Sequence, residues 1–217
     1  MISSNFKKRL NTSLFLFLIL ILIFNYNFLL VFTLIVLGVL GIIEFLSISK
    51  KIFKNKLYVY LSNTIFIIYI FILSTLFFYF SNFYELKTLL FIILLGCIAS
   101  DIGGFIFGKI IQGPKLTKIS PNKTISGSLG SLIFCSTIVL TLMYYFTLKL
   151  NLKIFIISLM ISAASQFGDL FISLLKRKAK LKDTGYFLPG HGGILDRIDG
   201  ILIGLPVGLI LFILFIK

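Results

Sequence analysis

The sequence predicts an all-α fold, a polytopic integral membrane helix bundle with about seven transmembrane helices. Three observations carry this prediction. The 217 residues are 59% hydrophobic and have a mean hydropathy of +1.10, which is unlike an ordinary soluble domain. Long apolar runs recur along the chain, and most reach the roughly 20 residues that a spanning helix needs. Short basic segments separate these runs.

Each run can be taken in chain order. The first is short for a full crossing, and the polar residues 25–27 separate it from the second. Its basic start resembles a signal peptide, but no small-residue cleavage site follows, so we expect this segment to remain as a helix. The expected spans are 12–24, 28–48, 57–80, 86–111, 127–148, 152–175 and 200–216.

The basic residues predict the orientation of these spans. If the N-terminus is inside, 17 of the 21 Lys and Arg residues lie in cytosolic segments and four lie outside. This distribution follows the positive-inside rule and predicts a multi-pass protein of the cell (inner) membrane. The net charge of +14 then reflects loops that face an anionic leaflet, and we expect no nucleic-acid partner.

The loops between the runs leave no room for a soluble domain. We therefore expect residues 1–217 to form a single membrane-embedded domain, with its active site at the cytosolic helix ends. Cys97 and Cys135 lie within apolar runs and form no disulfide or zinc pattern, so we expect both to be small buried hydrophobic residues.

Segment 173–199 holds the densest group of ionisable residues. Nine of them and one His occur within 27 residues, together with four Gly and one Pro. Charge near lipid is costly unless it is paired, hydrated or bound to a ligand. A mixture of cations and carboxylates suits a phosphate-rich substrate and a divalent metal.

Four of the seven acidic residues form a candidate metal site. Asp101 and Asp169 lie within spans, roughly 15 and 10 Å from the cytosolic ends, and each is flanked by small residues that allow close helix packing. Asp196 and Asp199 are three residues apart where the last helix begins. We expect Asp169, Asp196 and Asp199 to hold Mg²⁺, with Asp101 nearby. Solvation, pairing with lysine and helix capping are the alternatives.

Three other features leave more than one interpretation open. The loop 115–124 can face the headgroup layer with Lys123 and Thr124, or it can simply be solvated. The glycines around His191 allow a close approach to a ligand, but a lone His is weak evidence for acid–base chemistry. Glu44 has no assigned role, and pairing with Lys50 or Lys51 is one reading.

The spacing of segment 173–199 resembles the signature of phosphatidate cytidylyltransferase, also called CDP-diacylglycerol synthase. Weaker similarities are Ser-Pro-Asn-Lys-Thr at 120–124, Asp101 with Phe105 and Gly108, and Gln166 with Gly168 and Asp169. Ser126 departs from the acidic residue that the family often has there. The signature consists of Ser173, Lys176, Arg177, Lys182, Asp183, the run Leu-Pro-Gly-His-Gly-Gly at 188–193, Asp196, Arg197 and Asp199.

The resemblance implies that CTP and phosphatidate react at the bilayer to give CDP-diacylglycerol and pyrophosphate with Mg²⁺. A second cation and a homodimer are left open. It implies catalytic roles for Lys182, Asp183, Asp196, Arg197 and Asp199. It implies substrate binding by Ser120, Lys123, Thr124, Lys176, Arg177, His191, Gly192 and Gly193. It is consistent with metal binding by Asp101, Asp169, Asp196 and Asp199.

Two other functions compete with this one. A CTP-dependent polyprenol or dolichol kinase would transfer a different phosphoryl group to an alcohol, and the complete signature favours the cytidylyltransferase. A cation-coupled transporter would use Asp101 and Asp169 as coupling sites. Charge gathers at one membrane face and no internal repeat is visible, which argues against a transporter.

Overall fold

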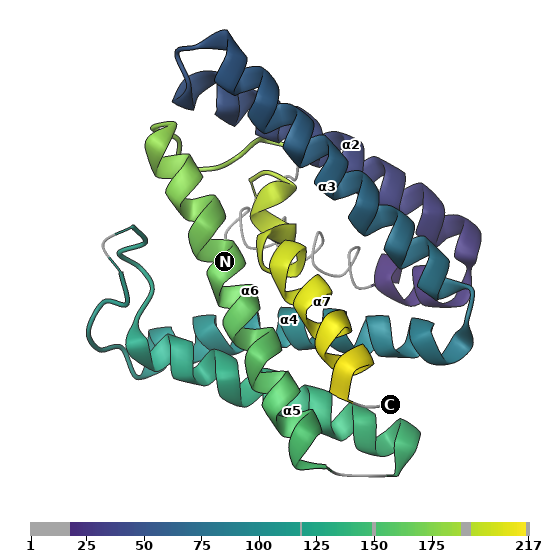
Figure 1. Cartoon of the computed structure of the whole chain (residues 1–217). Coiled ribbons are helices and arrows are strands. Elements are labelled where there is room, and N and C mark those ends of the chain that lie inside the picture. The colour runs from purple at the N-terminus through teal and green to yellow at the C-terminus, as the bar shows by residue number, and fades with distance from the viewer. Residues whose placement is uncertain (1–17, 118, 149–150, 188–191, 216–217) are drawn as a thin grey trace, which may run out of the picture. The chain divides into compact units, whose positions relative to one another are not determined.

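The computed structural model describes residues 18–117, 119–148, 151–187 and 192–215. Within these ranges every extended regular element is a helix, which confirms the predicted all-α class. Residues 18–25 are helical, and Tyr26 separates them from the next helix. Residues 12–17 of the first predicted span lie outside the described residues. Six long helices follow, namely α2 (Asn27–Ile52), α3 (Lys56–Ser81), α4 (Tyr84–Ile110), α5 (Ile125–Thr147), α6 (Leu152–Lys178) and α7 (Leu195–Phe215), as Figure 1 shows.

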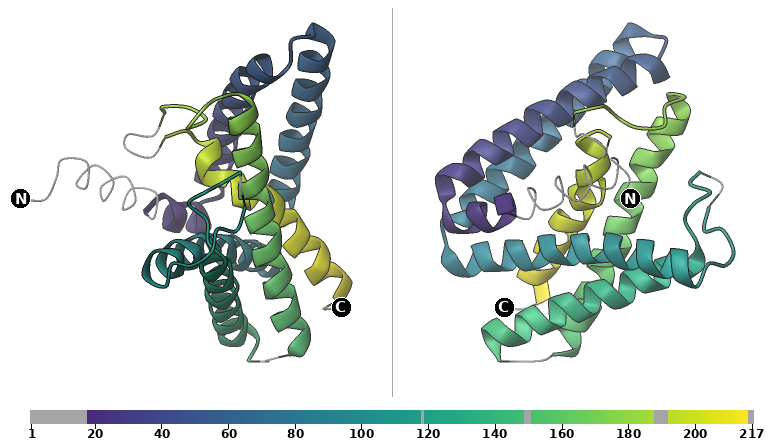
Figure 2. Two further views of the ribbon diagram at one scale, coloured as in Figure 1. Left: turned by 90° about the vertical axis from the view of Figure 1, so that its left-hand side faces the viewer. Right: turned by 180° about the vertical axis from the view of Figure 1, so that it is seen from behind.

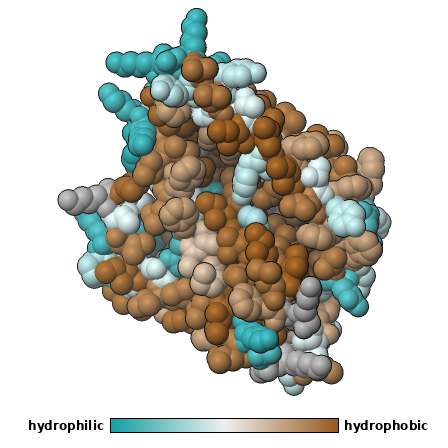
Figure 3. Space-filling model, viewed as in Figure 1, coloured by the Kyte–Doolittle hydropathy of each residue, from teal (hydrophilic) through white to brown (hydrophobic). Residues whose placement is uncertain are grey.

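All six helices are long and apolar enough to cross a membrane. Many large apolar side chains point outward, including Phe28 and Phe71, which are 81% and 68% exposed. Figure 3 shows the apolar side chains that dominate the face seen there. Such a surface is unfavourable in water and favourable in lipid, so the protein is a multi-pass membrane protein.

The helix ends follow from local sequence. Asn55 and Thr124 precede α3 and α5, and their side chains accept hydrogen bonds from the backbone N–H groups of Leu57 and Gly127 at 2.9 and 3.1 Å. These are ordinary N-caps. Basic residues occupy the last turns of α2, α4 and α6, where the helix dipole favours positive charge.

The chain divides into two compact units. The first comprises Met1–Lys87 and Leu175–Arg197. In it, α2 and α3 form an antiparallel hairpin that stays side by side in both views of Figure 2. The rings of Phe45 and Phe66 stack at 4.0 Å, and Ser49 donates a hydrogen bond to Asn63 at 2.7 Å. The prediction of one domain over 1–217 stays a prediction.

The second unit comprises Thr88–Leu174 and Ile198–Lys217 and depends on small residues. A Cβ atom added at Gly103 of α4 would lie 2.5 Å from the carbonyl oxygen of Gly130 in α5. Likewise, Gly168 of α6 lies directly against the backbone of Asp199 in α7. The predicted small-residue stripes are therefore confirmed as close helix contacts.

The last helix begins earlier than expected. The apolar run predicted a start near residue 200, whereas α7 begins at Leu195. Hydropathy misses this start because Asp196, Arg197 and Asp199 are polar. Both aspartates consequently lie within the helix, three residues apart, as the spacing predicted.

Candidate active site

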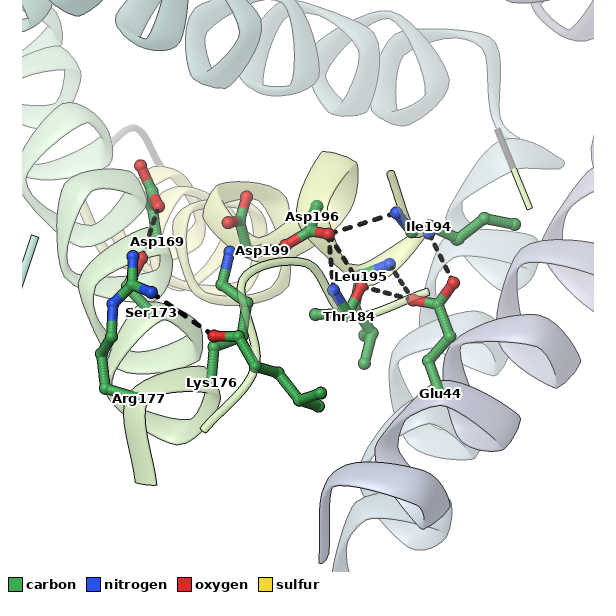
Figure 4. Close-up of polar contacts among 12 residues, drawn as sticks. Glu44, Asp169, Ser173, Lys176, Arg177, Thr184, Ile194, Leu195, Asp196 and Asp199 are labelled. Carbon is green, nitrogen blue, oxygen red and sulfur yellow. Dashed lines mark hydrogen bonds and ion pairs between the residues drawn. The ribbon is translucent and has the colours of Figure 1, made fainter. Parts of the chain in front are cut away.

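Asp196 is the centre of a polar network in the first unit. Its Oδ1 forms an ion pair with Nζ of Lys176 at 2.6 Å. Both side chains are largely buried, with 9% of Asp196 and 13% of Lys176 exposed. Its Oδ2 accepts from the backbone N–H groups of Thr184 and Gly193 at 2.8 and 3.1 Å, and from the Thr184 hydroxyl at 3.0 Å. Asp196 thus joins the end of α6, the loop that follows and the start of α7, as Figure 4 shows.

Glu44 contributes a second carboxylate to the same unit. It is 2% exposed and lies in α2. Its Oε1 accepts from the backbone N–H of Ile194 at 2.8 Å, and its Oε2 accepts from that of Leu195 at 2.9 Å. The Thr184 hydroxyl also contacts Oε2 at 2.7 Å. Figure 4 shows the Glu44 side chain directed at the start of α7.

Sequence reasoning missed this role of Glu44. The reading in which Glu44 pairs with Lys50 or Lys51 is wrong, since the Glu44 carboxylate instead accepts hydrogen bonds from Ile194, Leu195 and Thr184. The sequence feature that could have indicated this role is the depth of Glu44 within its predicted span. Glu44 lies eight residues before the end of α2 at Ile52, or about 12 Å along the helix axis. A carboxylate at this depth within a span indicates a functional residue, as it does for Asp101 and Asp169.

Three glycines of the loop make room for these contacts. Gly192 has a φ of +83°, which side chains rarely adopt. A Cβ atom at Gly193 would lie 2.6 Å from Oε2 of Glu44, and one at Gly185 would collide with Oε1. The predicted substrate-binding residues Gly192 and Gly193 therefore have a local structural reason to be glycine. Predicted His191 lies outside the described residues.

A carboxylate cluster lies in the second unit. Asp199 is 6% exposed, and its Oδ1 accepts from the N–H of Gly200 at 2.9 Å. Its carboxyl group lies near that of Asp169 and within electrostatic range of that of Asp101. Asp199 is thus near Asp169, whereas Asp101 interacts with it only electrostatically, and their role as metal ligands stays a prediction. The fourth predicted ligand, Asp196, has the contacts described above in the first unit.

Asp169 has additional partners. Its carboxylate forms an ion pair with Lys123 and accepts a hydrogen bond from Ser173 at 3.4 Å. Pairing with lysine, one of the alternatives for Asp169, is therefore present in this structure. The pair also connects the loop before α5 to α6.

The loop before α5 is a short, folded turn. Lys115 and Thr124 form an antiparallel bridge, and the carbonyl oxygen of Ser120 accepts from the N–H of Lys123 at 3.1 Å. An open cavity of about 400 Å³ lies beside it, lined by Lys115, Leu116, Thr117 and Pro121. The predicted residues Ser120, Lys123 and Thr124 therefore occupy one compact turn.

The remaining predicted site residues lie on the surface of the first unit. Arg177 is exposed and donates to the carbonyl oxygen of Leu181 at 3.4 Å. Lys182, Asp183 and Arg197 are also exposed. The catalytic and substrate-binding roles given to these residues stay predictions.

The donor set suits a hard cation. Within the described ranges no group of three or more His, Cys, Asp or Glu side chains is arranged to hold a metal ion. Mg²⁺ does not require such a cage, because it is usually bound by one or two carboxylates together with waters and substrate phosphates. The carboxylates of Asp169 and Asp199 offer oxygen ligands of the kind that Mg²⁺ prefers.

The fold and these clusters define a class of protein. It is a multi-pass helical membrane protein with lysines and carboxylates at the ends of its helices, a combination suited to anionic substrates. The profile of the Cytidylyltransferase family matches residues 2–215. The chain belongs to this family.

Several curated proteins named phosphatidate cytidylyltransferase are similar to this chain. The Staphylococcus aureus (strain COL) protein is 46% identical over 117 residues, which are 52% of this chain and 45% of that protein. The Rickettsia felis protein is 41% identical over 128 residues, 54% of this chain and 56% of that protein. The Helicobacter pylori (strain J99) protein is 41% identical over 110 residues, 49% and 40% respectively. The match spans about half the length of these relatives.

Proposed function

We propose that the chain transfers a cytidylyl group from CTP to phosphatidate, forming CDP-diacylglycerol and pyrophosphate. The observation that carries this proposal is the family match over residues 2–215 combined with the complete signature at 173–199. The names of the similar proteins support the choice of phosphatidate as the acceptor.

The proposal places the site at the cytosolic face of the inner membrane. The C-terminal turns of α2, α4 and α6 carry the basic residues Lys50, Lys109 and Lys176, among others. The positive-inside rule assigns these ends to the cytosol, where CTP is available. The headgroup of phosphatidate lies at the same depth, so lipid and nucleotide can meet there.

The reaction joins two anions. An oxygen of the lipid phosphate attacks the α-phosphorus of CTP, a new P–O bond forms, and the bond from that phosphorus to the oxygen shared with the β-phosphate breaks. Pyrophosphate leaves with that electron pair. No strong base is needed, because the lipid phosphate is already ionised. Charge neutralisation is therefore the main catalytic requirement.

Lysines of this chain can supply part of that neutralisation. Lys123 and Lys176 are each held in an ion pair with an aspartate, which fixes their ammonium groups. We expect both to contact substrate phosphates, and exposed Arg197 and Lys182 to add positive charge. Thr124 and Gly127 hold the loop of Lys123 at the start of α5.

Magnesium completes the proposed site. Asp169 and Asp199 would hold it, and Asp101 would share or tune it. Asp196 is retained from the sequence prediction, because α7 carries it three positions before Asp199. When bound, Mg²⁺ would neutralise phosphate charge in the transition state.

Product analysis tests the proposal. Purified protein is incubated with CTP, Mg²⁺ and phosphatidate in mixed micelles, and the lipids are analysed by mass spectrometry. The expected product is CDP-diacylglycerol, formed only with all three components present. A phosphorylated polyprenol formed in parallel assays, with no CDP-diacylglycerol, would support the lipid-kinase alternative instead.

A further inference from the structure

Glu44 is a buried carboxylate outside the signature, yet it contacts the signature three times. Its partners are the backbone N–H groups of Ile194 and Leu195 and the hydroxyl group of Thr184. The contacts join residues 140 to 151 positions apart in the chain. A helix leaves its first N–H groups without partners in the helix, and Glu44 satisfies two of them beside the start of α7.

The charge of Glu44 suits this position. The N-terminus of a helix carries a partial positive charge that favours a carboxylate. The described residues place no lysine or arginine in an ion pair with Glu44. The helix end and its N–H groups therefore supply the stabilisation that a buried carboxylate requires.

Thr184 links Glu44 to the signature carboxylate. Its hydroxyl oxygen lies 2.7 Å from Oε2 of Glu44 and 3.0 Å from Oδ2 of Asp196. A hydroxyl group carries a single proton to donate, so the two carboxylates share this donor. Because the N–H of Thr184 also donates to Asp196, displacement of Thr184 would alter two of the contacts that hold Asp196.

The glycines of the loop are consistent with this arrangement. Side chains at Gly185 or Gly193 would occupy the space of the Glu44 carboxylate. The loop backbone at Gly185 and Gly193 therefore lies directly against the Glu44 side chain, which leaves no space there for a larger residue.

We propose that Glu44 is a positioning residue for cytidylyl transfer, which holds Thr184 and the start of α7 so that Asp196 keeps its orientation. The inference rests on the proposed function for its kinetic part only, since the contact itself can be tested without substrate.

The first measurement is hydrogen–deuterium exchange of the full-length protein in detergent, without substrate. In Glu44→Gln, one carboxylate oxygen is replaced by an NH₂ group, which cannot accept from an N–H group. The amide of Ile194 or of Leu195, whichever then faces the NH₂ group, should exchange about tenfold faster, as expected for loss of a hydrogen bond to a charged group. Glu85→Gln is the matched control, because Glu85 is exposed in the first turn of α4.

The second measurement separates positioning from a merely structural role. Glu44→Gln should lower kcat by about tenfold to a hundredfold, the cost of a small misplacement at a reacting centre, with KM for CTP changed less than threefold. Thr184→Val should do the same, while Thr184→Ser, which keeps the hydroxyl group, should retain wild-type kcat. These Thr184 variants decide the question if Glu44→Gln does not fold.

Each result has a defined meaning. Unchanged exchange at Ile194 and Leu195 in folded Glu44→Gln would overturn the contact. Faster exchange with kcat within twofold of wild type, or an equal loss in Thr184→Ser and Thr184→Val, would overturn the positioning role. If the wild-type protein forms no CDP-diacylglycerol, the proposed function fails, and the exchange result still judges the contact.

Discussion

The ion pair between Lys176 and Asp196 gives a prediction with a definite magnitude. Its atoms are 2.6 Å apart, and only 13% and 9% of the two side chains is exposed. Lys176→Met removes the cation and leaves Asp196 with its three other donors. Asp196→Asn keeps an oxygen for those donors and turns an NH₂ group toward the ammonium group. Each single substitution should therefore lose one charge-assisted hydrogen bond, about 1.5–3 kcal/mol.

A double-mutant cycle measures this interaction. The free energy of unfolding is determined for the wild type, both single variants and the double variant, by SDS titration in mixed micelles followed by circular dichroism. We expect a coupling energy of about 1.5–3 kcal/mol. The pair Lys123–Asp169 is a useful comparison, because its side chains are 26% and 28% exposed. It should couple more weakly, nearer the value of about 0.2–1 kcal/mol found for exposed pairs.

A weak coupling would refute this reasoning. If the Lys176–Asp196 cycle gives less than about 0.5 kcal/mol, the pair behaves as an exposed ion pair. Burial and short distance would then not determine its strength, and Asp196 would not be the anchor of the network described here.

Three further predictions follow from other parts of the structure. Gly103→Ala should destabilise the second unit by about 1–3 kcal/mol through overpacking against Gly130. On heating, a thiol dye should then react with buried Cys97 and Cys135 at a lower temperature than in the wild type, and an unchanged temperature would contradict the close contact. Single cysteines at Asn55 and Lys180 should react only with membrane-permeant reagents in intact cells, and labelling by an impermeant reagent would contradict the orientation. Asp199→Asn should lower turnover by at least about 10²-fold at limiting Mg²⁺, and near-normal turnover would exclude it as a metal ligand.

The helices were predictable because lipid imposes a simple requirement on the sequence. Every buried backbone group must bond within the segment, so long apolar runs form helices. The predicted ends differ from the observed ends by a few residues for most helices. The largest difference is at α7, which starts at Leu195 rather than near residue 200. Contacts from Asp196 and Glu44 satisfy N–H groups there, and hydropathy cannot register such contacts.

The candidate site was predictable where side chains carry the information. The spacing of Asp196 and Asp199 and the depth of Asp169 were visible as patterns of charge. Glu44 was not recognised, because its partners are mainly backbone N–H groups about 150 positions away. Backbone donors leave no trace in a sequence, so only the folded chain reveals this contact.

The central claim is that the chain transfers the cytidylyl group of CTP to a lipid phosphate. The most direct measurement uses two samples of CTP, one labelled at the α-phosphate and one at the γ-phosphate, each incubated with purified protein, Mg²⁺ and phosphatidate. We predict that the α-phosphate label enters the lipid fraction and that the γ-phosphate label is released as pyrophosphate. Entry of the γ-phosphate label alone into lipid would contradict the claim and identify a kinase.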